Sequence, residues 1–534
     1  MLFAPRDLRT TDADVAQDMA AGIYVFGDRT MRLGRDSPFA TQPPSEDWTA
    51  ELYGFGWLRH LRAADTGPAR DMARMLVASA FGAHRREFGR GVARRPAVVA
   101  RRVISLLAHS PLLMSGADHS LYRAYLGAIG RDAAALERDM REAPVPLERL
   151  VAAIGLCFAG LCCQGLDGRL RRAIRALSLE LDAQILADGG HVSRNPGILL
   201  DLLLDLLPLR LLFGSRSVEI PPALDRAVDR MMPMLRFFRH GDGELALFNG
   251  MGRTSLGDLA TILSLDPDRG APALHAARSG YDRVEAGRTL VIVDTGPAPP
   301  LAASGAAHAG CLSFELSRGQ SRIVVNCGAP SRRGPARDAA RLTAAHSTLV
   351  LDEVSSGDAL SDETSGWAAS YLHRRLGPVL LSGPRSAGGE RGTTAAGDEI
   401  LSGHHDGYGR LFGATHVRRL RLAADGAELA GEDTLSVGSG RSPEGHAARL
   451  RFHLHPGTGA EPAESGSIRL HTSGGERWLF DAEGGSGPPR LEDSIFFAVS
   501  EGRRATRQIV VDLPLGEGAS RPTIRWRFRL AAGE

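Results

Sequence analysis

The sequence predicts a multidomain α+β protein, in which an N-terminal α/α toroid-like helical domain (residues 1–275) precedes a C-terminal antiparallel β-sandwich (residues 286–534). Three observations predict this fold. Apolar residues recur every three to four positions from about residue 65 to residue 266, they alternate every two positions after about residue 270, and Gly/Pro-rich turns separate the later runs. The change of period places the domain boundary near residues 266–286.

The helical prediction depends on long Ala- and Leu-rich segments. Leu150, Ile154, Cys157 and Phe158 lie on one helical face, and short Pro- or Gly-containing breaks separate such segments. The segment 198–214 is apolar around most of its circumference, which is typical of a helix buried between other helices. These patterns predict antiparallel helix hairpins in a layered or toroidal domain.

The second half is predicted to form antiparallel strands. Leu312, Phe314 and Leu316 alternate before a turn at Gly319–Gln320, and the alternation resumes at Ile323, which predicts a β-hairpin. Further runs of this type begin at Leu290, Ser347, Val417, Leu450, Ile495, Gln508 and Thr523. Many strands without intervening helices indicate a large sandwich.

Composition excludes several classes of function. The 64 basic and 62 acidic residues leave a formal charge of +2, so no broad positive field is available to bind nucleic acid. No lysine occurs in the sequence, which excludes Schiff-base and P-loop chemistry. The five cysteines form no C-x-x-C pair, so neither a disulfide framework nor a thiolate zinc site is predicted.

The chain is expected to be soluble and cytoplasmic. Its N-terminus has no apolar signal-peptide core, and its most apolar stretch, residues 150–163, is shorter than the roughly 18 to 20 residues that cross a bilayer. We therefore expect no membrane span.

Two loops and one aromatic segment of the first half are candidates for ligand binding. Trp57 belongs to an aromatic-rich segment that either stacks on sugar rings or fixes the N-terminal segment to the helices. Residues 188–197 group His191, Arg194 and Asn195, and Asn195 could equally cap the following helix, with Pro196 at its first position.

The second loop, residues 239–249, carries His240 and Asn249. It either rims a cavity or only forms a turn through Asp242 and the adjoining glycine.

In the β half, several histidines lie beside predicted strands. His405, Tyr408, His416 and Arg418 fall within one short stretch, which concentrates imidazoles, a phenol and a guanidinium. An isolated histidine such as His308 is more often a hydrogen-bonded structural residue than a base. No nucleophile elbow, H-E-x-x-H helix or dinucleotide-binding fingerprint is present.

Five phrases resemble the heparinase II/III-like polysaccharide lyases, a family with an α/α toroid followed by a β-sandwich. They are D188-GGHVSRNP, R239-HGDGELALFN, H308-AGCLSFELSRGQSRIVVNCG, T343-AAHSTLVLD and H405-DGYGRLFGATHVRRLRL. The resemblance implies an acidic polysaccharide or oligosaccharide as partner, cleaved by β-elimination in a cleft between the domains. It also gives the periplasm or cell envelope as the alternative location.

The family's catalytic positions are substituted in this chain. Its Asn-His pair corresponds to Leu147-Glu148, its Tyr-His pair to Ile198-Leu199, and the first histidine of its His-x-His to Ala306, while the second is His308. β-Elimination needs a neutralised carboxylate, a base and an acid, and aliphatic side chains supply none of these groups.

The resemblance also implies a zinc site at His308, Asn326 and His346. Asn326 stands where zinc-containing relatives have an Asp, which removes the anionic ligand, so we expect low zinc occupancy and no other cofactor.

Two hypotheses of function follow from the sequence. The first is a lyase-like enzyme acting on an acidic envelope or capsule glycan, with Tyr408, His405, His240 and His191 as substitute catalytic residues. The second is a catalytically silent, glycan-binding family member. In either case the predicted ligand contacts are Arg194, Asn195, Asn249, Arg418 and Trp57.

Overall fold

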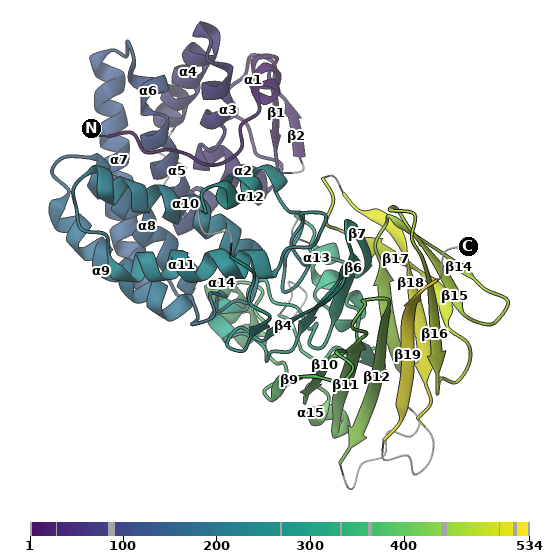
Figure 1. Ribbon diagram of the computed structural model, residues 1–534. Helices are drawn as coiled ribbons and strands as arrows, with labels where there is room; N and C mark the ends of the chain where they lie inside the picture. Colours follow the sequence, from purple (N-terminus) through teal and green to yellow (C-terminus); the bar gives the residue numbers. More distant parts are fainter. Residues whose placement is uncertain are drawn as a thin grey trace. The chain divides into compact units, whose positions relative to one another are not determined.

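The protein is described by a computed structural model, which covers residues 3–27, 29–83, 91–266, 270–331, 334–360, 366–438, 446–500, 502–515 and 521–531 (Figure 1). Packing divides the chain into two units that interleave along the sequence. Unit 1 contains residues 1–185, 200–229 and 257–268, and unit 2 contains residues 186–199, 230–256 and 269–534. Residues 267–269 of the predicted boundary lie outside the described residues.

Unit 1 is built mainly of helices. They are α1 (Ala13–Ala20), α2 (Glu46–Gly54), α3 (Leu58–Ala64), α4 (Gly67–Ala83), α5 (Pro96–Ala108), α6 (Ser110–Met114), α7 (His119–Glu142), α8 (Pro146–Cys162), α9 (Asp167–Gln184) and α12 (Leu256–Ser264), with a short 3₁₀ helix at Gly91–Arg94. Helices α10 (Pro196–Ser215) and α11 (Pro222–Phe237) have residues in both units, and the first residue of α12, Leu256, belongs to unit 2. A hairpin of β1 (Ile23–Phe26) and β2 (Arg29–Arg32), which the sequence did not predict, precedes α2.

Helix α8 forms the centre of unit 1. It packs against α5, α7 and α9, and its residues from Ala152 to Cys162 are buried. A side chain at Gly160 would lie 2.7 Å from the Cβ of Leu170 on α9, so only glycine permits this close approach. The most apolar predicted helical stretch is therefore a central helix of the bundle.

Unit 2 contains two antiparallel sheets. The eight-stranded sheet has the order β14-β15-β16-β19-β12-β11-β10-β9, and the nine-stranded sheet has the order β17-β18-β13-β7-β6-β5-β4-β3, with β8 paired to β13.

The strands of the eight-stranded sheet are β9 (Ala387–Thr393), β10 (Glu399–His405), β11 (Ala414–Leu422), β12 (Glu428–Val437), β14 (Thr458–Pro462), β15 (Ile468–Thr472), β16 (Arg477–Glu483) and β19 (Thr523–Leu530). Those of the nine-stranded sheet are β3 (His275–Ala276), β4 (Tyr281–Ala286), β5 (Thr289–Asp294), β6 (Phe314–Arg318), β7 (Ser321–Val325), β8 (Leu349–Leu351), β13 (Ala448–Leu454), β17 (Arg490–Phe496) and β18 (Arg504–Leu513).

The predicted hairpin is confirmed as β6 and β7, which turn at Gly319, where φ is +53°. Side chains from both sheets form one core, in which Phe314 of β6 stacks on Trp526 of β19 at a centroid distance of 5.4 Å. The order of a helical region followed by an antiparallel sandwich is thus confirmed.

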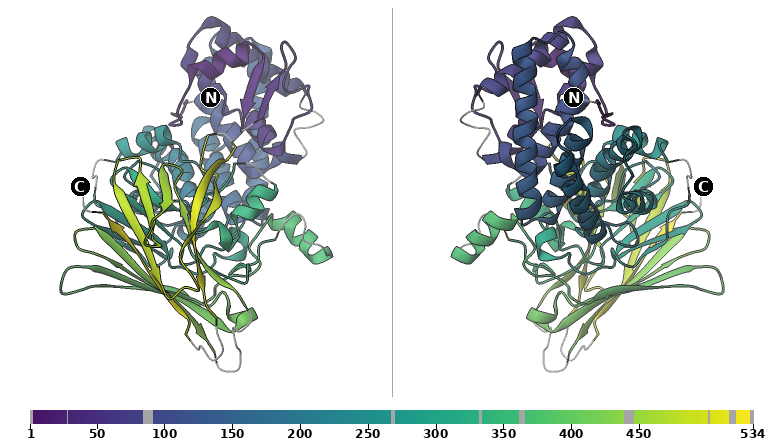
Figure 2. Two further views of the ribbon diagram at one scale, coloured as in Figure 1. Left: turned by 90° about the vertical axis from the view of Figure 1, so that its right-hand side faces the viewer. Right: turned by 90° about the vertical axis from the view of Figure 1, so that its left-hand side faces the viewer.

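Helix α14 (Trp367–Leu376) projects from unit 2 in both views of Figure 2. None of its residues is buried, and the side chain of Trp367 is 85% exposed. Short helices α13 (Pro335–Ala340) and α15 (Gly409–Phe412) and 3₁₀ turns at Leu301–Ala303 and Thr343–Ala345 complete the elements of this unit within the described residues.

Among the helices that the structure describes, none combines the length and the apolar composition that a membrane crossing requires.

Candidate functional site

All but one of the predicted site residues lie in unit 2, and the first group surrounds the carboxylate of Asp294. Arg194 donates from Nη2 to Oδ1 of Asp294 at 2.5 Å and to the carbonyl oxygen of Gly280 at 2.9 Å. Its Nε and Nη1 donate to the carbonyl oxygens of Ser279, Gly296 and Pro297. Its side chain is 8% exposed. These contacts are internal to the unit, so Arg194 ties the 186–199 segment to β4 and β5.

Asn249 completes this group from the second predicted loop. Its Nδ2 donates to the hydroxyl of Tyr281 at 2.7 Å and to Oδ2 of Asp294 at 3.1 Å, and its Oδ1 accepts the backbone N–H of His308 at 3.2 Å. Tyr281 in turn donates to the carbonyl of Arg194 at 2.6 Å. Burial raises the pKa of Tyr281, which keeps its phenol protonated.

Tyr281 was not predicted from the sequence, although it is the phenol nearest to this cluster of candidate residues. Its position at the start of a short alternating run is typical of an ordinary strand residue. Arg194 and Asn249, its partners, both have positive φ, at +63° and +47°. Such left-handed backbone at bulky residues is costly, and here a dense set of hydrogen bonds holds it in place.

The remaining residues of the 188–197 segment have structural roles. Oδ1 of Asn195 accepts the N–H of Gly197 at 2.8 Å at the start of α10, whose first residue is Pro196, so the capping interpretation is confirmed. The Nδ1 of His191 accepts from the Ser193 hydroxyl at 2.8 Å, and burial lowers the pKa of His191 to about 4.

His240 attaches the 239–249 loop to the sandwich. Its Nε2 lies 3.0 Å from Oε2 of Glu315 and its Nδ1 lies 2.8 Å from the hydroxyl of Ser317, and neither His240 nor Glu315 has an exposed side-chain surface. Arg322 of β7 adds ion pairs to Asp242 at 2.8 Å and Glu244 at 2.9 Å. These hydrogen bonds and ion pairs therefore hold the 239–249 loop against β6 and β7.

The predicted zinc ligands lie together but do not fit zinc. His346 donates from Nδ1 to the carbonyl of Leu342 at 2.8 Å, so its Nε2 is an acceptor, and it lies 3.0 Å from Nδ1 of His308. This hydrogen bond occupies the lone pair that a metal would need. Burial lowers the pKa of His346 to about 4 and holds the pKa of His308 well below its ordinary value.

The third predicted ligand is also engaged. Oδ1 of Asn326 accepts the N–H of Ser347 at 3.0 Å, and its Nδ2 donor has no acceptor among the described residues. Within those residues, no three His, Cys, Asp or Glu side chains are grouped as a metal site would require. A neutral amide with its donor turned inward is a poor zinc ligand.

His405 and Tyr408 lie in the interior of the sandwich. The hydroxyl of Tyr408 donates to the carbonyl of Leu349 at 2.8 Å, and His405 lies 3.3 Å from His416, whose Nε2 donates to Asp433 at 2.6 Å. His405 is fully buried and Tyr408 is 1% exposed. Burial raises the pKa of Tyr408 and holds the pKa of His405 well below its ordinary value.

Arg418 belongs to the same buried group. It donates to both oxygens of Asp433, and its Nη1 donates to the carbonyl oxygens of Leu312 and Ser347 at 2.6 and 2.9 Å. These contacts link β11 of the eight-stranded sheet to the segments that precede β6 and β8 of the nine-stranded sheet.

Trp57, the candidate in unit 1, is 3% exposed and donates from Nε1 to the carbonyl of Leu52 at 3.0 Å. It packs edge-on against Phe55 at 5.6 Å. This placement matches the interpretation in which the aromatic segment packs within the helical unit.

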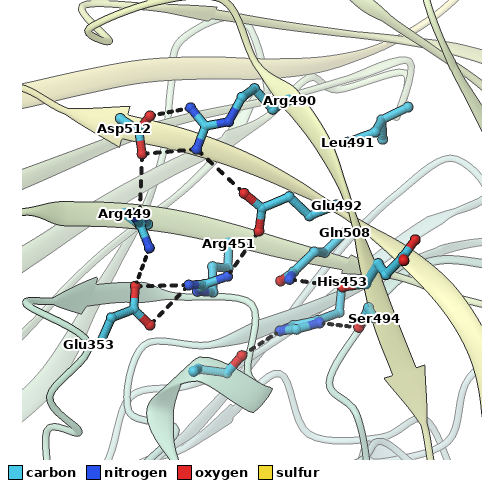
Figure 3. Close-up of polar contacts among 12 residues, drawn as sticks. Glu353, Arg449, Arg451, His453, Arg490, Leu491, Glu492, Ser494, Gln508 and Asp512 are labelled. Carbon is cyan, nitrogen blue, oxygen red and sulfur yellow. Dashed lines mark hydrogen bonds and ion pairs between the residues drawn. The ribbon is translucent and has the colours of Figure 1, made fainter.

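A polar network that the sequence did not predict covers the side of β13 opposite the core (Figure 3). Arg449 and Arg451 both contact Glu353, at 2.6 and 3.0 Å. His453, the next outward residue, donates from Nε2 to the carbonyl of Ala344 at 3.0 Å and accepts from the Ser494 hydroxyl at 2.7 Å. Arg449, Arg451 and His453 alternate with apolar residues along the sequence, and this alternation could have shown that the three lie on one face of a strand.

Comparisons with known proteins agree with this architecture. Residues 268–527 match the family model described as heparinase II/III-like, C-terminal. The chain is 35% identical over 481 residues to FtsZ-localized protein C of Caulobacter vibrioides (strain NA1000 / CB15N), which covers 87% of this chain and 80% of that protein.

Two solved structures share the fold at low identity. Heparinase III superposes with a TM-score of 0.77 at 11% identity, covering 99% of this chain and 86% of that chain. A mutant of heparan sulfate lyase HepC from Pedobacter heparinus gives a TM-score of 0.66 at 14% identity, covering 99% and 85%. These likenesses confirm the α/α toroid and β-sandwich. The match to the family model and the 35% identity to the Caulobacter protein show that the chain belongs to the heparinase II/III-like family.

Proposed function

We propose that this chain has the heparinase fold but no lyase activity, and that it localises with FtsZ in its own cell. The observation that carries the first part is the state of the predicted catalytic groups. Tyr408, His405, His191 and His240 are each at most 2% exposed, and each makes hydrogen bonds inside unit 2.

The chemistry of proton transfer supports the same proposal. A general base must reach the proton it removes within about 2.6–3.2 Å, directly or through one water. The hydroxyl of Tyr408 donates its hydrogen to a backbone carbonyl. The phenol of Tyr281 is fully buried and donates to the backbone carbonyl of Arg194. The resemblance to the family aligns its Tyr-His pair with Ile198 and Leu199, whose aliphatic side chains carry no proton-transfer group, and this supports the proposal.

The second part rests on the relative from Caulobacter vibrioides, which is named for its localisation with FtsZ. Its 35% identity extends over 87% of this chain, so the relation includes both units. The predicted cytoplasmic location is part of this proposal.

An activity assay tests the first part. Wild-type protein incubated with heparin, heparan sulfate and alginate should give no rise in absorbance near about 232 nm, where unsaturated uronate products absorb. Cleavage of any of these glycans would contradict the proposal.

A wider acidic-polysaccharide panel tests the lyase hypothesis in its substitute-residue form. If turnover of another glycan is found, Tyr408→Phe and His405→Ala should lower it by roughly 10²-fold or more. Tyr125→Phe is the matched control, because Tyr125 is also a buried tyrosine that donates to a backbone carbonyl. Glycan retention without turnover would instead favour the glycan-binding hypothesis.

A fluorescent fusion in the source bacterium tests the second part, and it also reports the compartment. We expect its signal to coincide with labelled FtsZ, and we expect purified protein to co-sediment with polymerised FtsZ. A uniform signal that ignores FtsZ, together with no co-sedimentation, would refute this part while leaving the absence of lyase activity standing.

A further inference from the structure

The outward face of the eight-stranded sheet in unit 2 carries a cavity of about 320 Å³. Its walls come from β11, β12, β19 and β16, which lie side by side in Figure 1 and pair in that order. Along each strand every second residue faces outward, because the alternate residues fill the core. The outward residues therefore form rows that cross the sheet.

One of these rows has a complete set of charges. Arg419, Glu432 and Arg525 are register partners on β11, β12 and β19. The carboxylate of Glu432 lies 3.6 Å from Arg419 and 2.9 Å from Arg525, so a single anion on β12 bridges two arginines.

The adjacent row has the two arginines without the anion. Its register partners are Arg421, Ala430 and Arg527, so a methyl group stands where the first row has a carboxylate. Arg421 turns toward Asp398 at 2.8 Å and Glu428 at 2.5 Å.

Arg527 is only weakly paired. Among the described residues, its guanidinium group contacts one carboxylate, with Nε 3.4 Å from Oδ2 of Asp481. Asp481 also accepts a hydrogen bond from Ser467 and lies 3.7 Å from Arg529, so its charge is shared. The side chains of Arg421 and Arg527 are 42% and 44% exposed, which leaves both guanidinium groups accessible above Ala430.

We propose that the cavity above Ala430 binds the carboxylate of an acidic side chain from a peptide segment, held between Arg421 and Arg527. The bound carboxylate takes the place that Glu432 fills in the adjacent row. Guanidinium groups suit this role because they bind carboxylates through two parallel N–H donors. The site is independent of the proposed function and of the residues named in it.

The charges of the cavity wall favour a peptide over a polyanionic glycan. Four arginines and four carboxylates line it, so its net charge is zero. A polymer with an anion on every repeat would bring its anions close to Glu432 and Glu483 as well as to the arginines. Its anions and these two carboxylates would repel each other. A peptide with one acidic residue flanked by basic residues can pair with both signs.

Calorimetric titration of the full chain with a synthetic peptide tests the site. The probe is acetyl-Arg-Ala-Glu-Ala-Arg-amide, and its control carries Gln in place of Glu. We expect the Glu peptide to bind saturably with a Kd below about 5 mM, and the Gln peptide to bind at least about tenfold more weakly. No binding of the Glu peptide, or equal binding of both, would overturn the proposal.

Three variants locate the binding. Ala430→Glu supplies the missing carboxylate, so it should abolish binding and should melt at a higher temperature than Ala430→Gln. Ala430→Ser keeps the space open and should bind within about twofold of wild type. Binding that survives Ala430→Glu would place the peptide elsewhere, and tighter binding of methyl glucuronide than of the Glu peptide would overturn the choice of a peptide.

Discussion

Arg418 and Asp433 are register partners on the neighbouring strands β11 and β12, and their side chains meet inside the sandwich. The guanidinium Nε lies 2.8 Å from Oδ1 and Nη2 lies 3.2 Å from Oδ2. His416 and the indole of Trp526 also donate to Asp433, at 2.6 and 2.7 Å. These donors hold the pKa of Asp433 well below its ordinary value despite its burial.

Replacing this carboxylate should destabilise the protein strongly. Asp433→Asn leaves Arg418, which is 1% exposed, without a counter-charge, and breaking a buried ion pair from one side costs about 3–5 kcal/mol. Denaturant unfolding followed by fluorescence should show this loss in the free energy of unfolding. Asp493→Asn, which removes a fully exposed carboxylate from a 3.8 Å contact with Arg507, should give no measurable change. Equal effects from the two variants would mean that the buried pair is not stabilising.

Metal content should be low. Because His308 and His346 bond to each other and Asn326 is neutral, we expect protein purified without added metal to hold substoichiometric zinc by elemental analysis, and chelation to change its melting temperature little. Asn326→Asp restores an anionic donor and should raise the zinc content toward one ion per chain. One zinc per chain in the wild type would show that the histidine pair opens to accept the ion.

Acid should destabilise the protein partly through His453. Burial lowers the pKa of His453 to about 3, with His346 and Arg451 nearby adding to the effect. The unfolded side chain titrates near about 6.5, so the unfolded state takes up the proton first as pH falls. The stabilising contribution is therefore complete above about pH 6.5 and is lost progressively toward about pH 3, at about 1.4 kcal/mol per pH unit.

His453→Gln should flatten the pH dependence of unfolding by about this slope between pH 4.5 and 6. The glutamine can still donate to Ala344 and accept from Ser494, the two contacts drawn in Figure 3. His471→Gln, at a side chain that is 46% exposed, is the matched control. An unchanged slope in His453→Gln would assign the acid sensitivity to other groups.

The predicted domain boundary near residues 266–286 can be tested by cutting the chain within it. A protease site inserted after Gly270, which is exposed, should yield two fragments that co-elute in gel filtration. Co-elution is expected because Arg194 and Asn249, in the first fragment, bond to Asp294 in the second. After separation in denaturant and refolding, circular dichroism should show a helical and a β-rich fragment. A β-rich N-terminal fragment would refute the domain assignment.

The fold was predictable because each of its two hydrophobic periods recurs through a long part of the chain. The stretch around Cys157 became the buried helix α8, and the turn at Gly319 joined two strands as expected. The β1–β2 hairpin was missed because its four-residue strands are too short for a period to show.

The surroundings of the predicted site residues were harder to predict. On β11, His416 and Arg418 share the inward phase of Leu420 and Leu422, so alternation alone indicates that they point into the core. Their partner Asp433 could not be found in this way, because pairing register between strands is not encoded in either strand by itself. Tyr281 and Glu315 were missed for the same reason.

The interleaving of the two units also constrains how such a chain can change by gene rearrangement. The polypeptide passes between the units at residues 185/186, 199/200, 229/230, 256/257 and 268/269. A recombination event at one junction that moved the sandwich into another protein would leave residues 186–199 and 230–256 behind, and with them Arg194 and Asn249. In the recombined protein Asp294 would be buried without its cation, and selection would remove such a destabilised protein. The helical unit and the sandwich are therefore expected to be inherited as one piece, and to diverge together rather than by shuffling.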